Sequence, residues 1–214
     1  MNSNPFASEI AKPEASIQNK ASKFPVINDG KTWYTLIIIS ENLAGVLNQI
    51  TNVFTRRQLN IESLNVSPSG FPGLHRYTVT CRSEASEMKK LVKQIEKKID
   101  VVLARFYTED EVYVMEQALY KISTARLVEN HEISKAIRQH DGKIVEVNSV
   151  FSIVSIEGLP NDIVALRHKL LEAGGMVQFV SSGIVAVTRT AREELSDLLE
   201  RRKRDEKEQE QQEK

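Results

Sequence analysis

Apolar residues in this chain change their spacing in the same order twice, and this repeated order constrains the fold more than any other feature. In each half, a strand-like apolar run is followed by apolar residues at helical spacing, two strand-like runs, a second helical segment and a last strand-like run. In the first half these segments are 32–40, 46–54, 60–69, 73–81, 88–99 and 101–107. In the second half the order is fainter, and the segments are 111–123, 127–140, two strands within 142–158, 163–171 and 176–189.

This order of elements leads to one architecture. Right-handed crossovers place both helices on one face of a four-stranded antiparallel sheet, which is the ferredoxin-like sandwich. We therefore predict an α+β chain with two ferredoxin-like βαββαβ domains. The opposite face of the first sheet is left without cover. An apolar face or edge of this kind is usually covered by another copy or a partner, so we expect self-association.

The segments also set the expected domain limits, at 32–108 for the first domain and 109–190 for the second. Residues 1–31 mix Ser, Asn, Lys, Ala and Pro without a sustained period, which indicates a poorly ordered arm. Residues 191–214 form a charged tail that we expect to be helical or disordered. Every residue from 201 to 214 is charged or Gln, a composition that cannot bury a core.

The charge balance excludes one large class of partner. Lys and Arg together number 29, as do Asp and Glu, so no basic excess is present to neutralise a nucleic-acid backbone.

A single cysteine, Cys81, excludes an internal disulfide and a Cys-based zinc site. The apolar runs are shorter than the ~20 residues that a membrane span needs, and the N-terminus lacks the order of a signal peptide. We expect a cytoplasmic protein with no nucleic-acid or membrane partner.

Motifs that carry catalytic chemistry are not found. The sequence has no glycine-rich phosphate loop, no G-x-S-x-G elbow, and no H-E-x-x-H or C-x-x-C pair. Its four histidines, His75, His131, His140 and His168, lack metal-ligand spacing. An RNA-binding domain of the RRM type shares the element order, but residues 74–79 offer one aromatic and no glycine-rich consensus. We expect no catalytic residue, no metal site and no cofactor in this chain.

The stretch SENLAGVLNQI, residues 40–50, places Gly45 in the first turn of a predicted helix, where glycine costs about 0.5–1 kcal/mol relative to alanine. Either a ligand approaches the backbone there, or the glycine is incidental. Unpaired N–H groups and the helix dipole favour an anion at a helix start, and a carboxylate is the smallest biological anion that fits. Asn42 adds a carboxamide near this loop, or else it is the helix N-cap.

Asn60 supplies a second polar group, just after the first helix. In a paired dimer, the strand that it opens could approach the loop of the partner. An amino acid would then meet helix N–H groups at its carboxylate and the Asn60 carbonyl at its amine, and its side chain would lie near Leu43, Val46 or Leu47. The competing interpretation is an asparagine that serves only the turn.

Further stretches extend the pattern around Gly45. SENLAGVLNQI is followed by LNIESLNVSPS, and QIEKKIDVV, QALYKIS, GKIVEV and SSGIVAVTR come later in that order. This series, over residues 33–189, resembles the regulatory (small) subunits of acetolactate synthase, also called acetohydroxyacid synthase, whose N-terminal half is an ACT domain. The resemblance implies a non-catalytic subunit that activates a catalytic subunit and makes it sensitive to valine or related branched-chain amino acids. Thiamine diphosphate, Mg and FAD are then expected on the catalytic subunit.

The resemblance also implies where the effector site falls. It covers the loop and helix start of one protomer and the second strand of its neighbour: Asn42, Leu43, Ala44, Gly45, Val46, Leu47, Asn60 and Ile61. Asn65 and Ser67 flank the same strand, and their side chains could modulate feedback. The first domain is thereby assigned to effector binding and homodimer formation, and the second to activation of the catalytic (large) subunit. Residues 1–31, the C-terminal extension and the loop 69–76 depart from commoner members.

Two other interpretations stay open. A free-standing amino-acid-sensing ACT protein, regulating a different enzyme or a transcription factor, would share the effector site but ignore acetolactate synthase. A purely structural dimerisation module would bind no amino acid at all.

Overall fold

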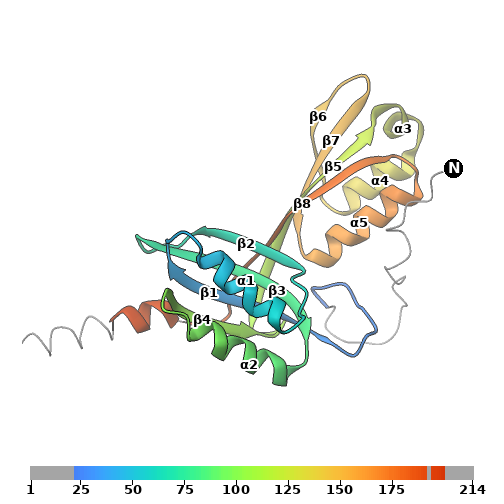
Figure 1. Ribbon diagram of the computed structural model, residues 1–214. Coiled ribbons are helices and arrows are strands. Elements are labelled where there is room, and N and C mark those ends of the chain that lie inside the picture. The colour runs from blue at the N-terminus through green and yellow to red at the C-terminus, as the bar shows by residue number, and fades with distance from the viewer. Residues whose placement is uncertain (1–21, 192–193, 201–214) are drawn as a thin grey trace, which may run out of the picture.

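The computed structural model describes residues 22–191 and 194–200 and contains two four-stranded antiparallel sheets, each with helices on one face (Figure 1). The first sheet has the strand order β2-β3-β1-β4. Its elements are β1 (Thr32–Glu41), α1 (Val46–Arg56), β2 (Ser63–Pro68), β3 (Leu74–Ser83), α2 (Ala85–Glu96) and β4 (Val101–Tyr107). The predicted ferredoxin-like order of the first half is confirmed.

Alternation along β1 explains the packing of the first domain. Tyr34, Leu36 and Ile38 lie on the helix side of the sheet and are at most 5% exposed. The two helices each present one apolar stripe to these side chains, and the buried residues of the stripes are Val46, Ile50, Val53, Phe54, Met88, Leu91, Val92 and Ile95. Since burying a large apolar side chain contributes about 1.5–3 kcal/mol, these stripes hold both helices on the same face.

The second sheet repeats the topology, with the strand order β6-β7-β5-β8. Its elements are β5 (Val112–Ser123), α3 (Thr124–Glu129), α4 (His131–Gln139), β6 (Lys143–Val147), β7 (Phe151–Gly158), α5 (Pro160–Glu172) and β8 (Met176–Thr188). The helix predicted over 127–140 is divided in two. Asn130 adopts an extended conformation, with φ −113° and ψ 102°, and its side chain accepts a hydrogen bond from the N–H of Glu132. Asn130 therefore ends α3 and caps α4.

Two long strands join the sheets. The paired segments 112–116 of β5 and 184–188 of β8, which we call the ribbon, run from the second sheet across the helix-free face of the first (Figure 1). Gly183, at φ 75°, precedes the crossing part of β8 and lies against Ser63 of β2. The N–H of Ile184 donates to Ser63 Oγ over 2.9 Å, and Arg76 Nη2 donates to the carbonyl of Ala186 over 2.6 Å. These bonds fix the ribbon across β2 and β3.

The ribbon changes the expectation for the uncovered face of the first sheet. The apolar pattern predicts that another copy or a partner covers this face, but the chain covers much of it with its own strands. Ile37 and Ile39 are 5% and 1% exposed, and they share a core with Val112, Val114 and Ile184. The predicted cover was wrong because apolar spacing shows which face is buried but not what buries it. The self-association that was expected from it stays a prediction.

Segments assigned to the arm and the tail also contribute to this core. Phe24 is 1% exposed and stacks on Trp33, with 4.8 Å between the ring centroids. Residues 194–200 are helical, and Leu195 is 2% exposed. The rest of the predicted arm, 1–21, and the charged stretch 201–214 lie outside the described residues. None of the helices in the described ranges combines the length and apolar character that crossing a membrane requires.

Candidate ligand-binding site

Gly45 is the N-cap residue of α1 and has left-handed backbone angles, φ 90° and ψ −10°. A residue with a Cβ is disfavoured in this conformation, by about 1–2 kcal/mol. A Cβ built at Gly45 meets no atom within 4 Å, so the backbone is open on that side. The glycine is therefore not incidental: the loop needs its conformation, and the space beside it is free.

Two backbone donors at the N-terminal end of α1 have no hydrogen-bond acceptor among residues 22–191 and 194–200. The first bond of the helical ladder runs from the N–H of Gln49 to the carbonyl of Gly45, over 3.0 Å. The N–H groups of Leu47 and Asn48 precede it and have no acceptor within the helix. Among the described residues no side chain caps this end, and no acidic residue lies in the first turn. The end keeps its partial positive charge and suits an anion.

Asn42 is not the N-cap of α1, which was one of its two predicted roles, because Gly45 occupies that position. The N–H of Asn42 donates to the carbonyl of Gly73 over 2.9 Å, which ties the loop to the turn between β2 and β3. Asn42 and Ala44 are exposed, and Leu43 and Leu47 expose 53% and 41% of their surface. These exposed residues flank Gly45 in the loop and in the first turn of α1.

The side chain of Val46 lies elsewhere than predicted. It belongs to the core under α1 and is 1% exposed, so it does not reach the space beside Gly45. The contribution of Val46 to a site at this loop is confined to its backbone.

Asn60 and Ile61 lie in the connection between α1 and β2, since the strand begins at Ser63 rather than at Asn60. Asn60 is exposed, and Ile61 packs partly against the core of the first domain. The left-handed position of this turn is taken by Gln58, at φ 53°. The length of α1, about 16 Å at 1.5 Å per residue, separates Asn60 from Gly45. One chain therefore does not bring these two predicted residues together.

Asn65 and Ser67 lie on β2, opposite Thr78 and Arg76 of β3, and both are half-buried. They alternate with apolar residues and share a sheet face with Ser63, the acceptor of the bond from β8. Ser63 and Arg76 were not among the predicted site residues. The signal that could have found Ser63 is the polar series at 63, 65 and 67, on the face where apolar residues were expected.

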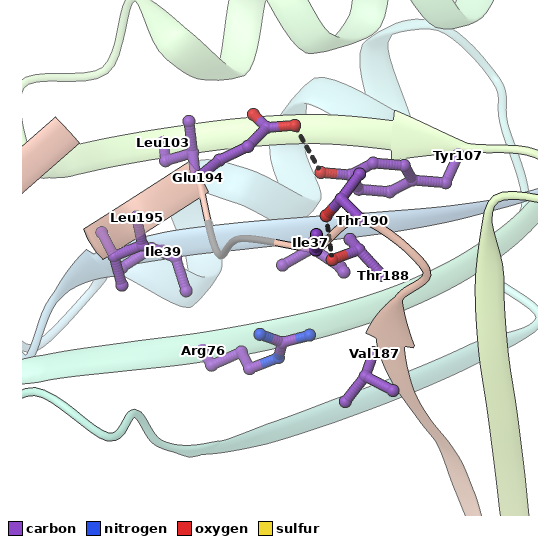
Figure 2. A pocket seen from close by; sticks show the side chains of 11 residues that line it. Ile37, Ile39, Arg76, Leu103, Tyr107, Val187, Thr188, Thr190, Glu194 and Leu195 are labelled. Carbon is purple, nitrogen blue, oxygen red and sulfur yellow. Dashed lines mark hydrogen bonds between the residues drawn. The ribbon is translucent and has the colours of Figure 1, made fainter. Parts of the chain in front are cut away.

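A cavity of about 230 Å³ lies between the first sheet, the end of β8 and residues 194–200 (Figure 2). Tyr107 Oη donates to Glu194 Oε1 over 3.2 Å, and Arg105 Nε donates to Glu194 Oε2 over 3.0 Å. Burial and the adjacent Glu194 carboxylate raise the pKa of Tyr107 to about 12, against a smaller opposing effect of Arg105 and Arg76. This cavity could not be predicted from the sequence, because its walls come from residues 37–107, 187–191 and 194–195, which are far apart in the chain.

The single cysteine of the chain, Cys81, is part of the core of the first domain. Cys81 is fully buried, with its Sγ 3.7 Å from Met88 Sδ, and burial, aided by Glu62, raises the pKa of its thiol to about 12. Its sulfur is therefore a protonated core atom and not a nucleophile. The described residues hold no group of three or more His, Cys, Asp or Glu side chains arranged to bind a metal.

Comparisons with known proteins show which family the chain matches. Residues 36–103 match the family model described as an AHAS small subunit-like ACT domain, and residues 115–190 match the model described as the small subunit of acetolactate synthase. The two models together cover more than half of the chain.

Individual relatives match along most of the chain. It is 30% identical to the acetolactate synthase small subunit of Mycolicibacterium smegmatis over 166 residues, 78% of this chain and 96% of that protein. It is 32% identical to the corresponding subunit of Bacillus subtilis, over 76% of this chain and 92% of the relative. The crystal structure of the small subunit from Thermotoga maritima aligns with a TM-score of 0.66 and 26% identity, covering 75% of this chain and 99% of that one.

Proposed function

Because the chain belongs to the family of acetolactate synthase small subunits, we propose that it binds valine between two copies of its ACT domain and thereby controls the catalytic subunit. Members of this family are regulatory and non-catalytic, and membership implies association with a catalytic large subunit. The proposal adds the effector, its position and the dimer. Thiamine diphosphate, Mg and FAD belong to the catalytic subunit, and the complex acts in the cytoplasm.

The observation that carries the proposal is the open N-terminal end of α1. Gly45 leaves the backbone accessible, and the N–H groups of Leu47 and Asn48 are available to a carboxylate. The exposed side chains of Leu43 and Leu47 supply apolar surface beside it. A short branched side chain such as that of valine suits this surface, because it adds apolar contact without polar atoms that would lose water.

A second copy supplies the amine partner. The β2 strand lies at the edge of its sheet, and within the described residues it pairs only with β3. Antiparallel pairing of two β2 strands would place the start of one beside the end of the other. The end of β2 leads into the turn at Gly73, which is bonded to Asn42 of the Gly45 loop. The Asn60 and Ile61 of one protomer would thereby approach the Gly45 loop of its partner.

The ligand controls activity through its preference for one state of the complex. A ligand shifts an equilibrium only by its differential affinity for the two states, so the inhibited state is the one whose dimer interface closes on valine. A coupling of about 1–3 kcal/mol is sufficient for feedback.

We assign activation and docking to the second domain. Its strands carry large apolar side chains that are 45–62% exposed, at Tyr113, Leu119, Val177, Val180, Val185 and Val187. Exposed apolar surface of this kind is typical of protein–protein contacts, and a catalytic subunit would cover it.

The test is acetolactate formation by the matching catalytic subunit, with and without this chain, across a titration of valine. The expected result is activation by the chain and reversal of that activation by valine. Parallel titrations with leucine and isoleucine rank the branched-chain effectors. No change in rate on adding the chain would contradict the proposal. A free-standing sensor for another enzyme predicts that outcome, and the match of residues 115–190 to the acetolactate synthase model weighs against it.

A further inference from the structure

The cavity between the two domains has apolar walls and a small volume. Ile37, Ile39 and Leu103 of the first sheet form one wall, and Leu195 of the helical residues 194–200 forms another. The first three are at most 7% exposed and Leu195 is 2% exposed, so these walls belong to the buried core that the first sheet shares with the ribbon. The volume of about 230 Å³ lies below the ~300–1,000 Å³ of sites for drug-sized ligands, so the cavity suits a small metabolite.

Opposite charges stand on opposite sides of this cavity (Figure 2). The guanidinium of Arg76 lies on one side, where Nη2 holds the carbonyl of Ala186. The carboxylate of Glu194 lies on the other side, oriented by Tyr107 and Arg105. The hydroxyls of Thr188 and Thr190, 2.9 Å apart, lie between them in Figure 2. A carboxylate has about four lone-pair sites, so Glu194 can accept further donors besides these two.

We propose that this cavity is a second amino-acid site, which takes a small aliphatic α-amino acid as its zwitterion. Arg76 and the threonine hydroxyls bind the carboxylate, and Glu194 binds the ammonium group. The side chain of the ligand packs on Ile39, Leu103 and Leu195. An α-amino acid is a small molecule that carries a carboxylate, an ammonium group and an apolar side chain. The cavity offers a cationic side, an anionic side and an apolar wall, one for each of these groups.

This site differs from the one at Gly45 in its construction. It lies within a single chain and needs no second copy, so it does not rest on the proposed dimer. Its walls come from the first sheet, the end of β8 and residues 194–200, so a bound ligand touches both domains. A ligand that binds only when these parts are together stabilises their contact by mass action. Occupancy would therefore hold the second domain on the first.

The experiment measures L-valine and L-leucine binding to the full chain by titration calorimetry, in the wild type and in a Gly45→Asp background. We expect one site for each chain to persist in Gly45→Asp. In that background, Glu194→Gln should weaken binding about tenfold or more, because the amide keeps the shape but loses the charge. Leu103→Phe, which fills the cavity, should abolish binding. The matched control is Glu96→Gln, since Glu96 also pairs with Arg105 but does not line the cavity.

Ligand analogues test the two charges separately. 3-Methyl-2-oxobutanoate lacks the ammonium group of valine, and isobutylamine lacks its carboxylate, so neither should bind to the Gly45→Asp chain. Hydrogen exchange should show that valine protects residues 184–191 and 194–200 in that background, with 143–158 unchanged as a reference.

The outcomes separate the two proposals. If Gly45→Asp removes all binding, the cavity proposal is overturned and the Gly45 site stands. If Gly45→Asp changes nothing while Glu194→Gln removes binding, the cavity proposal stands and the Gly45 site fails. Equal binding by wild type and Glu194→Gln in the Gly45→Asp background, or equal binding of the oxo acid, overturns the cavity proposal.

Discussion

The two domains share one topology but start their first helices differently. In the first domain, α1 begins at Gly45 without a capping side chain. In the second, β5 leads directly into α3, where Ser123 Oγ accepts from the N–H of Arg126 over 3.4 Å, and Asn130 caps α4 through the N–H of Glu132. Side chains thus occupy, in the second domain, the donors that the first leaves open. We therefore place the proposed anion site in the first domain and expect none at the corresponding position of the second.

The largest expected effect comes from closing that open end. Gly45→Asp places a carboxylate at the anion position and adds the strain of a left-handed side chain, about 1–2 kcal/mol. We expect valine inhibition to be lost while activation of the catalytic subunit is kept, as measured by acetolactate formation across a valine titration.

The matched control for this change is Gly30→Asp. Gly30 also has a left-handed φ, 73°, and open space at its Cβ, but it lies outside the α1 loop. It should leave inhibition unchanged. Normal valine inhibition in Gly45→Asp would mean that the open helix end has no part in binding.

Asn60→Ala tests whether the site is shared between two copies. Losing a hydrogen bond to a charged amine should weaken valine binding by about 1.5–3 kcal/mol, measured by calorimetry. Mixing Asn60→Ala chains with Gly45→Asp chains should restore wild-type affinity at part of the sites, because one of the two sites in a mixed dimer has both residues intact. Unchanged affinity in Asn60→Ala, or no restoration on mixing, would refute a shared site.

Alkaline pH should weaken the first domain before the second. The thiol of Cys81 ionises near pH 9.0 in the unfolded chain but near 12 when folded, because burial raises its pKa. The folded state therefore holds an extra proton above pH 9, and stability falls by up to ~1.4 kcal/mol per pH unit. Burial also raises the pKa of Tyr120 in the second domain, but that loss begins only near pH 10.

Urea unfolding between pH 8 and 10 measures this difference. Cys81→Ala should remove the loss between pH 9 and 10, whereas Tyr120→Phe should leave it in place. The same pH dependence in wild type and Cys81→Ala would show that another group causes it.

The smallest expected effect is at the caps of the second domain. Asn130→Ala should destabilise the chain by about 1 kcal/mol, because α4 loses its N-cap, and leave the affinity for valine unchanged. Thermal denaturation measures the change in stability, and titration calorimetry measures the affinity for valine. Asn52→Ala, in the exposed middle of α1, is the control and should cost nothing, since alanine is the better helix former. Altered valine affinity in Asn130→Ala would show that the capped domain takes part in effector binding.

The order of elements could be predicted from the sequence because each strand and helix has its own apolar period. Gly45 could be singled out from its place in the first turn of a predicted helix, which is also a local signal, although its left-handed conformation was not foreseen. What could not be predicted depends on distant parts of the chain. The helix-free face of the first sheet is covered by the ribbon, Phe24 and Leu195, which lie far apart in the sequence. Asn60 can approach a Gly45 loop only in a second copy of the chain, and the spacing of apolar residues along one chain does not predict how two copies pair.

The long separation between partners also fixes an order of events during synthesis. The bond between Ser63 and Ile184 joins residues 121 apart, and the core around Ile37 and Ile39 is completed only when Ile184, Ala186 and Leu195 have been made. While the ribosome makes the second half, the first sheet is covered by its two helices on one face, and its other, apolar face stays exposed to water. Such a nascent chain is prone to aggregation, and contacts of this span form slowly. The first domain is therefore translated first, but its buried core is completed only after the second domain has been made.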